Sequence, residues 1–292
     1  MQDSYLIDKA RVRASFDRAA HSYDGAAILQ TTVREEMLSR LDLVSMTPHT
    51  ILDLGCGTGH ASVALKQRFK AAQVISLDLA LSMLQKTQAN QPWLQKLFGQ
   101  KSLVCADIES LPIADASVDL IWSNLAIQWC NDLDQTFAEM QRVLKPDGLL
   151  MFSTFGPDTL KELRAASQNG HTHVSRFIDM HDIGDALSRM GFQAPVLDVE
   201  HFTLTYDDVQ SVMRDLKAIG AHNATAGRPK GLMGKGFLQQ LAQQYEPFRQ
   251  AEKAAGGQLP ATYEVVYGHA WKPKAKPAQL DGFSPIHFKP RA

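Results

Sequence analysis

A cluster of three glycines in the first quarter of the chain could bind a ligand. Gly55, Gly57 and Gly59 follow the short apolar segment 50–54 and precede a stretch with helical periodicity, so they form a strand-to-helix turn. Glycines at such a turn let the backbone bend sharply and approach a ligand closely. In an open α/β sheet, the same turn borders the crevice in which ligands bind. Because His60 stands where the dinucleotide fingerprint has its third glycine, the pattern disfavours NAD.

Three carboxylates stand at the carboxyl ends of predicted strands and could fix parts of a ligand. They are Asp53, Asp78 and Asp107. A carboxylate at Asp78 can accept hydrogen bonds from both hydroxyls of a ribose, and a helix N-cap is its alternative role. Asp107 is alternatively a turn residue. Occurring together at strand ends, the three acids predict a cofactor site.

The glycine loop resembles the first motif of class I S-adenosylmethionine methyltransferases, whose ligand carries an ammonium and a carboxylate in place of a pyrophosphate. The resemblance implies that Asp53 helps to hold the amino-acid end through its loop. It also implies that Asp107 and Ile108 touch the adenine, that S-adenosyl-L-homocysteine is the product, and that no metal is needed. The cofactor residues expected are Asp53, Gly55, Cys56, Gly57, Gly59, Asp78, Leu79, Asp107, Ile108, Ser123 and Asn124.

The end of the fourth predicted strand, residues 123–129, occupies the place where the cofactor's methyl group would face a substrate. Asn124 and Gln128 are therefore expected to act at the reaction centre. Leu125 and Trp129 belong to the same segment and are alternatively plain core residues.

Longer stretches resemble the BioC family of malonyl-acyl-carrier-protein O-methyltransferases over nearly the whole chain. The matching stretches are FDRAA (16–20) with Tyr23 and Asp24, DIESLP (107–112), VDLIWSNLAIQWC (118–130), SRF (175–177) and LKAIGA (216–221). This resemblance implies methyl transfer to the free carboxylate of a malonyl thioester, on acyl carrier protein or coenzyme A, at the start of biotin's pimeloyl arm.

Such a reaction needs a positioned acceptor more than a base, because a carboxylate is already ionised at neutral pH. Tyr23 is expected to act at the site because BioC-like chains carry a tyrosine there, and a buried aromatic packing residue is the alternative. Arg176 could grip the acceptor carboxylate through two parallel hydrogen bonds, or form a surface ion pair instead.

Basic residues in a long segment between the last two predicted strands could meet an acidic carrier protein. They include Lys217, His222 and Arg228. A charge run of this kind is alternatively a solvated face. His171 and His173 form a two-residue metal pair, but no third ligand stands at a suitable spacing, so no metal site is expected.

Two other functions stay open at this point. The stretch FGPDTLKELR (155–164) also resembles complex I assembly factors that hydroxylate a protein arginine, although nothing resembles the iron triad of two histidines and one carboxylate. A methyltransferase-fold binding protein without turnover, or a methyltransferase for another small metabolite, is a further alternative.

The elements that position these residues alternate between strands and helices, which predicts a Rossmann-like α/β fold with a seven-stranded, mostly parallel sheet and helices on both faces. Two helices are expected within residues 5–45. A turn at 145–148, with Gly148 at positive φ, should precede the fifth strand. The domains expected are a helical cap (1–48), a cofactor-binding core (49–206), a helical insertion acting as a substrate or carrier lid (207–260, with helices at 209–217 and 237–254), the last strand (261–272) and a flexible tail (273–292).

Composition excludes several classes of protein. The 292 residues are 45% hydrophobic, which predicts a substantial core. Thirty basic residues against thirty-one acidic ones provide no global field for nucleic acid or an anionic membrane. With no apolar run of signal or membrane-span length, a cytoplasmic protein is expected. Three scattered cysteines favour free thiols over disulfides or zinc.

Overall fold

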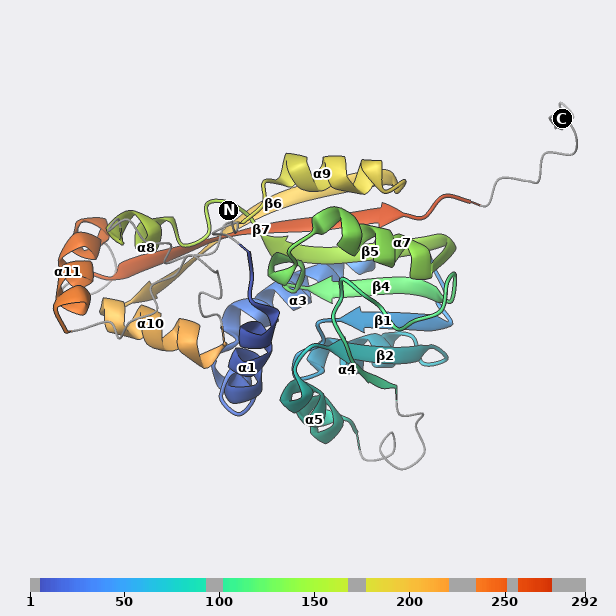
Figure 1. Ribbon diagram of the computed structural model, residues 1–292, viewed down its shortest axis with the longest axis horizontal. Coiled ribbons are helices and arrows are strands. Elements are labelled where there is room, and N and C mark those ends of the chain that lie inside the picture. Colours follow the sequence, from blue (N-terminus) through green and yellow to red (C-terminus); the bar gives the residue numbers. More distant parts are fainter. Residues whose placement is uncertain (1–5, 93–101, 168–176, 221–234, 251–256, 275–292) are drawn as a thin grey trace, which may run out of the picture.

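The computed structural model describes residues 6–92, 102–167, 177–220, 235–250 and 257–274 (Figure 1). Its strands are β1 (Thr50–Leu54), β2 (Gln73–Asp78), β3 (Leu103–Cys105), β4 (Val118–Asn124), β5 (Leu144–Phe155), β6 (Gln193–Tyr206) and β7 (Leu259–Trp271). Its helices are α1 (Lys9–Ala19), α2 (Tyr23–Ala26), α3 (Ile28–Leu41), α4 (His60–Arg68), α5 (Leu81–Asn90), α7 (Leu133–Val143), α8 (Lys161–Ala166), α9 (Met180–Arg189), α10 (Val209–Ala218) and α11 (Lys235–Tyr245), with 3-10 turns η1 (Ile127–Trp129) and η2 (Glu246–Phe248).

The described strands form one seven-stranded sheet in the order β3-β2-β1-β4-β5-β7-β6. The first five strands run parallel, and β7 lies antiparallel between β5 and β6. This confirms the predicted mostly parallel Rossmann-like sheet. The carboxyl ends of β1, β2 and β4 point toward α1 (Figure 1), so the residues that follow these strands meet at one edge.

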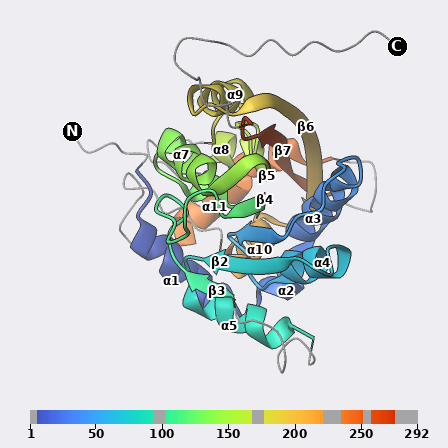
Figure 2. The ribbon, with the colours of Figure 1, turned by 90° about the vertical axis from the view of Figure 1, so that its right-hand side faces the viewer.

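Helices cover both faces of the sheet, as Figure 2 shows for α3 and α4 on one side and α7 on the other. Leu29, Val33 and Leu65 from α3 and α4 belong to one buried cluster, whereas Phe137 of α7 and Ile183 of α9 belong to a second. The four residues of β1 after Thr50 are all buried, as expected for a strand covered on both faces.

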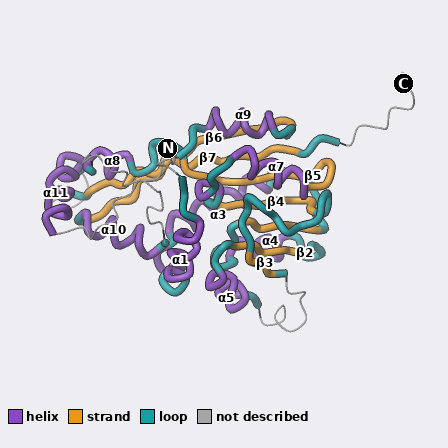
Figure 3. Tube along the Cα trace, viewed as in Figure 1, coloured by secondary structure: helices purple, strands orange, loops and turns teal. Residues whose placement is uncertain are grey.

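The two longest strands, β6 and β7, run past the others and carry α8, α10 and α11 around their far ends (Figure 3). The carboxylate of Asp208 caps α10 by accepting a hydrogen bond from the Ser211 N–H at 2.7 Å. Val212 of α10 and Leu241 and Tyr245 of α11 are buried in the same cluster as α3 and β1. The described helices of the predicted insertion, α10 and α11, are therefore packed into the main core.

Three details differ from the sequence-based expectations. The amino-terminal region holds three described helices, because the single turn α2 separates α1 from α3. The predicted turn at 145–148 falls within β5 and not before it, and there Asp147 rather than Gly148 has the positive φ, 61°. A Cβ at Gly148 would lie 2.7 Å from the Lys145 carbonyl oxygen, so this glycine is needed for close approach instead. The second insertion helix ends at Tyr245, where Pro247 enters the 3-10 turn η2.

Several predicted residues lie outside the described residues. They are His171, His173, Ser175, Arg176, His222, Arg228 and most of the tail, residues 275–292. Within the described residues, no helix combines the length and the apolar character that a membrane crossing requires.

Candidate functional site

The glycine turn after β1 is held tightly against its neighbours. The N–H groups of Gly55 and Cys56 donate to the Leu77 carbonyl oxygen at 2.8 and 3.0 Å. Gly55 has a φ of 70°, and a Cβ there would lie 2.3 Å from the Cβ of Ala126. A side chain at Gly55 would therefore push the turn away from the end of β4. The predicted glycine motif is thus a close-packing requirement at the edge where β1, β2 and β4 meet.

Asp78, at the end of β2, supports this turn through its carboxylate. Oδ2 accepts a hydrogen bond from the Gly57 N–H at 2.9 Å, and Oδ1 accepts one from the Ala80 N–H at 2.8 Å, just before α5 begins. Burial raises the pKa of Asp78 to about 6, although both backbone hydrogen bonds lower it. A carboxylate oxygen can accept more than one hydrogen bond, so both oxygens can still receive donors from a ligand.

Asp53 is fully buried beneath the turn. Its Oδ2 accepts a hydrogen bond from the Ser62 hydroxyl of α4 at 2.5 Å. Burial raises its pKa to about 7, against the lowering effect of the Ser62 hydrogen bond, and the charge of nearby Asp78 raises it further. The negative charge of Asp78 therefore disfavours ionisation of Asp53 beneath the same glycine turn.

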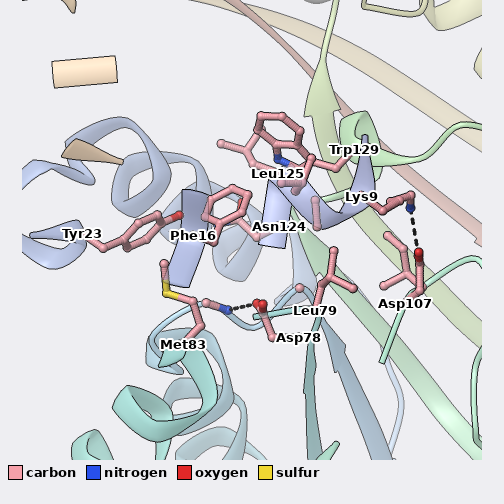
Figure 4. A pocket seen from close by; sticks show the side chains of 15 residues that line it. Lys9, Phe16, Tyr23, Asp78, Leu79, Met83, Asp107, Asn124, Leu125 and Trp129 are labelled. Atoms are coloured by element: carbon pink, nitrogen blue, oxygen red, sulfur yellow. Dashed lines mark hydrogen bonds and ion pairs between the residues drawn. The ribbon is translucent and has the colours of Figure 1, made fainter. Parts of the chain in front are cut away.

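A cavity of about 620 Å³, partly open to solvent, lies at this edge (Figure 4). Its walls combine polar groups with apolar side chains, as small-molecule sites do. The predicted cofactor residues that line it are Gly55, Gly57, Asp78, Leu79, Asp107, Ile108 and Asn124, and the other lining residues are Lys9, Val12, Phe16, Tyr23, Met83, Leu125, Ala126 and Trp129.

Lys9 of α1 is a site residue that the sequence reasoning missed. Its Nζ lies 2.9 Å from Oδ1 of Asp107 (Figure 4). The same atom lies 2.5 Å from Oε2 of Glu109. The contact joins residues almost a hundred positions apart, so no local motif indicated it. Lys9 thereby fastens the first helix over the acid predicted to touch a ligand.

Other contacts draw the same amino-terminal segment over the turn. The ring of Phe16 meets that of Trp129 edge-on, with centroids 5.4 Å apart. The Asp24 carboxylate accepts a hydrogen bond from the Thr58 hydroxyl at 2.6 Å and lies 3.2 Å from Nε2 of His60. The FDRAA motif with Tyr23 and Asp24 thus forms a clasp across the glycine turn.

A second cavity, of about 840 Å³ including open solvent, lies between α3 and the same turn. It shares Tyr23, Gly55, Gly57 and Asn124 with the first. Cys56 also lines it, and burial raises the pKa of this thiol well above its usual range, so the thiol stays protonated. The remaining lining residues are Asp24, Ala27, Gln30, Thr31, Arg34, Asp53, Thr58, His60 and Ala61.

The residues predicted at the reaction centre divide into two groups. Asn124 lines both cavities while its Nδ2 donates to the Gln30 carbonyl oxygen at 3.1 Å. Ser123 is fully buried and donates to the Leu54 carbonyl oxygen. The Gln128 amide donates to the Leu125 carbonyl oxygen at 2.6 Å, and Gln128 lines neither cavity. Gly59 lines neither cavity, but it packs α4 against Thr87 of α5.

Among the residues predicted to bind substrate or carrier, Tyr23 lines both cavities and Lys217 is exposed on α10. The Ser22 hydroxyl donates to the Ala218 carbonyl oxygen at 3.0 Å, so Lys217 lies near the clasp. Leu125 is buried and Trp129 is partly buried, and both line the first cavity. Packing in the core and lining the cavity, which the sequence offered as alternatives, are therefore compatible for these two residues.

One group of possible metal ligands occurs in the described residues. Donor atoms of Asp158, His201 and Glu264 lie within 4.8 Å of one another. The Lys161 ammonium lies 3.1 Å from the Asp158 carboxylate and neutralises it. Neither cavity is lined by these residues.

The chain resembles known proteins in both sequence and fold. Residues 52–152 match the family model described as a methyltransferase domain. The YcgJ protein from Bacillus subtilis has a similar fold, with a TM-score of 0.55 and 16% identity over 87% of this chain and 99% of that one. A likeness at this identity shows the fold alone.

Curated relatives are far more similar. A malonyl-[acyl-carrier protein] O-methyltransferase of Methylovorus sp. (strain MP688) is 68% identical, covering 99% of this chain and 98% of the relative. The protein of that name from Laribacter hongkongensis (strain HLHK9) is 55% identical, covering 100% and 99%. The matched length includes the glycine turn, the clasp and the segment between β6 and β7. The chain therefore belongs to the malonyl-[acyl-carrier protein] O-methyltransferase family.

Proposed function

We propose that this protein transfers the methyl group of S-adenosylmethionine to the free carboxylate of a malonyl thioester held on acyl carrier protein. The observation that carries the proposal is the match of 68% identity over 99% of the chain to a relative named for that reaction. Masking this carboxylate as a methyl ester is the step that the resemblance places at the start of biotin's pimeloyl arm.

The residues at the strand edge fit the cofactor. Asp78 offers a buried carboxylate for the ribose hydroxyls, and Leu79 and Ile108 offer apolar surfaces for the adenine. A Cβ built at Gly57 would meet a single atom within 4 Å, Cε1 of Tyr23 at 3.9 Å, so the backbone there stays open to a ligand. When bound, S-adenosylmethionine supplies an electrophilic methyl group on a sulfonium and leaves as S-adenosylhomocysteine.

The acceptor carboxylate needs orientation and a dry surrounding. Burial raises the pKa of Tyr23 well above its usual range, and the nearby acids Asp78 and Asp24 raise it further. The phenol therefore stays protonated and can donate a hydrogen bond to a carboxylate oxygen, a positioning role in which no proton is removed. Asn124 lines the cavity beside it.

Water must be excluded from the reacting groups, because water molecules that hydrogen-bond to the oxygens of the acceptor carboxylate would hinder their attack on the methyl group. Phe16 and Trp129 meet edge-on above the cavity, and Met83 and Leu125 line it as well. These apolar side chains reduce the hydration of the acceptor carboxylate and so strengthen its interactions with the remaining polar groups.

The carrier protein is proposed to dock beside the clasp. Lys217 is exposed at the end of α10, next to α2, and can attract an acidic partner. His222 and Arg228 follow it in the sequence, and Arg176 remains a proposed ligand of the malonyl carboxylate. Malonyl-acyl-carrier protein is the proposed natural substrate, and malonyl-coenzyme A is proposed as a smaller substrate that carries the same malonyl thioester.

Transfer of labelled methyl groups to matched acyl carriers tests this function. The protein is incubated with methyl-labelled S-adenosylmethionine and malonyl-, acetyl- or succinyl-carrier protein. Label is expected on the malonyl form, because acetyl lacks a carboxylate and succinyl places it one methylene further out. Label on the acetyl form would contradict the proposed acceptor. Cofactor binding without any transfer would favour a binding protein.

A further inference from the structure

The chain leaves β4 through a strained residue at the wall of the first cavity. Leu125, which directly follows the strand, has a φ of 49°, a left-handed conformation that a leucine side chain disfavours. Leu125 and its neighbour Asn124 both line the cavity (Figure 4). A strained backbone persists only where surrounding groups hold it, and such strain is concentrated at functional sites. The contacts that hold Leu125 therefore bear on the reaction.

A buried serine of the neighbouring strand holds both residues. Ser153 of β5 is fully buried, and its hydroxyl oxygen accepts a hydrogen bond from the Leu125 N–H at 3.0 Å. Because a backbone N–H can only donate, the single hydrogen of the hydroxyl is left for Asn124, whose Oδ1 accepts it at 2.9 Å. Ser153 thereby fixes which end of the Asn124 amide is the acceptor. The other end, Nδ2, has two hydrogens and can donate to the Gln30 carbonyl oxygen and to a ligand at once.

The opposite face of β5 holds the same turn through a second hydroxyl. Successive side chains of a strand point to opposite faces of the sheet, so Thr154 lies on the other face from Ser153. The Thr154 hydroxyl donates to Oε1 of Gln128 at 3.2 Å, and Nε2 of Gln128 donates to the Leu125 carbonyl oxygen at 2.6 Å. Since Gln128 lines neither cavity, it acts on the first cavity through Leu125.

We propose that Ser153 and Thr154 are positioning residues for methyl transfer, which act on the first cavity through Asn124 and Leu125. This inference rests on the proposed function. Attack on a methyl group in line with its leaving sulfur tolerates little displacement of the reacting groups. A cavity wall whose amide and backbone are fixed in advance therefore favours the transition state more than it favours binding. Neither hydroxyl-bearing residue lines a cavity itself.

Steady-state kinetics of a variant without the serine hydroxyl test the proposal. Ser153→Ala is expected to lower kcat with malonyl-carrier protein about 10- to 100-fold, because the Asn124 amide is then free to rotate. The KM for malonyl-carrier protein, and the Kd for S-adenosylhomocysteine by calorimetry, should change less than about 3-fold. The variant should fold, since the Leu125 N–H keeps the carbonyl oxygen of residue 153, 3.1 Å away, as an acceptor.

A second variant and a matched control separate positioning from stability. Thr154→Val removes the other hydroxyl at nearly constant shape and should lower kcat about 3- to 10-fold, a smaller loss because Gln128 still contacts Leu125. The control is Thr136→Val on α7, where the fully buried hydroxyl donates to the Asp132 carbonyl oxygen at 2.7 Å and lines neither cavity. This control should lower thermal stability about as much as Thr154→Val while leaving kcat unchanged.

The outcomes separate this proposal from the function on which it rests. Unchanged kcat in Ser153→Ala would overturn the proposal, and so would a fall in kcat matched by an equal loss of S-adenosylhomocysteine affinity. If Ser153→Ala did not fold, unchanged kcat in Thr154→Val would overturn it alone. An equal fall in kcat in Thr136→Val would mean a general effect of losing a buried hydroxyl and would overturn it too. If the wild-type protein transferred no methyl group to malonyl-carrier protein, the proposed function itself would fall.

Discussion

At the scale of single residues, the site depends on carboxylates that hold the backbone while facing a cavity. Asp78 is the clearest case, because each of its oxygens accepts a backbone N–H and the residue also lines the first cavity. Asp78 is not the N-cap of α5, because Ala80 occupies that position, and its ribose-binding role stays a prediction.

Replacing Asp78 should weaken cofactor binding strongly. Asp78→Ala removes the acceptor for the ribose hydroxyls and releases the Gly57 N–H, so the Kd for S-adenosylhomocysteine is expected to rise about 10- to 100-fold by calorimetry. Asp134→Ala is the matched control, because this carboxylate pairs with Arg189 at the surface and lines neither cavity. Equal losses of affinity for S-adenosylhomocysteine in the two variants would show that Asp78 does not bind the cofactor.

The buried acid Asp53 should make stability fall as the pH rises. Its pKa is about 7 in the folded protein against an ordinary value of 3.8, so between these values the folded state binds a proton that the unfolded state lacks. This group therefore contributes its full stability below pH ~4 and loses it as the pH rises through ~7.

Urea unfolding of the wild type and Asp53→Asn between pH 4 and 8 measures this contribution. The wild-type free energy of unfolding should decline relative to the variant's by an amount on the order of a few kcal/mol, because asparagine does not ionise. A difference that stays constant with pH would mean that Asp53 ionises normally in the folded protein.

The sequence predicted residues next to the strand ends more completely than those brought in from elsewhere. Asp78, Leu79, Asp107 and Ile108 line the cavity because each lies at the end of a strand or within three residues of it, and alternation determines the place of these strands in the sheet. Lys9 was missed, because its contacts with Asp107 and Glu109 depend on how α1, which precedes the sheet in the sequence, packs onto it. No spacing within the chain encodes those contacts.

At the scale of elements, α1 carries the first residues of the clasp, and its residues Lys9, Val12 and Phe16 line the first cavity. Its beginning is fixed by the Asp8 carboxylate, which accepts a hydrogen bond from the Arg11 N–H at 3.1 Å, and by the Lys9 ion pairs. Its Phe16 contacts Trp129, and a Cβ at Gly220 would lie 3.1 Å from the Phe16 ring. The family motif around Phe16 therefore has a packing reason that its sequence alone did not show.

Removing Lys9 should loosen this helix selectively. Lys9→Ala breaks the partly buried pairs with Asp107 and Glu109, a loss of about 1 kcal/mol, so amide hydrogen exchange in α1 should increase about 5-fold while α4 is unaffected. Arg13→Ala changes a cation on the same helix without touching these acids and serves as the control. Unchanged exchange in Lys9→Ala would show that the clasp does not depend on the ion pairs.

At the scale of the whole molecule, the described helices between β6 and β7, α10 and α11, pack into the core. The sequence predicted a helical insertion there and suggested a lid, because the residues lie between two strands and carry basic side chains. The burial of Val212, Leu241 and Tyr245 in the same cluster as α3 and β1 could not be read from periodicity, which identifies an apolar face but not what it packs against.

A core mutation in this segment should therefore destabilise the whole protein. Leu241 is 2% exposed, and Leu241→Ala is expected to lower the free energy of unfolding by about 2–5 kcal/mol in a single cooperative transition by denaturant titration. Leu43→Ala makes the same chemical change at a side chain that is 88% exposed and should alter stability by less than about 0.5 kcal/mol. Separate transitions for insertion and sheet would contradict a shared core.

The position of the transferred methyl group decides whether the site acts as proposed. Malonyl-carrier protein is incubated with the enzyme and S-adenosylmethionine, and the intact product is analysed by mass spectrometry before and after mild base. One added methyl group that base releases as methanol is expected, because the carboxylate oxygen becomes a methyl ester. Base also cleaves the thioester, so the methanol, and not the loss of mass from the carrier, identifies the ester. A methyl group that resists base, or one found on the carrier polypeptide, would show that the malonyl carboxylate is not the acceptor.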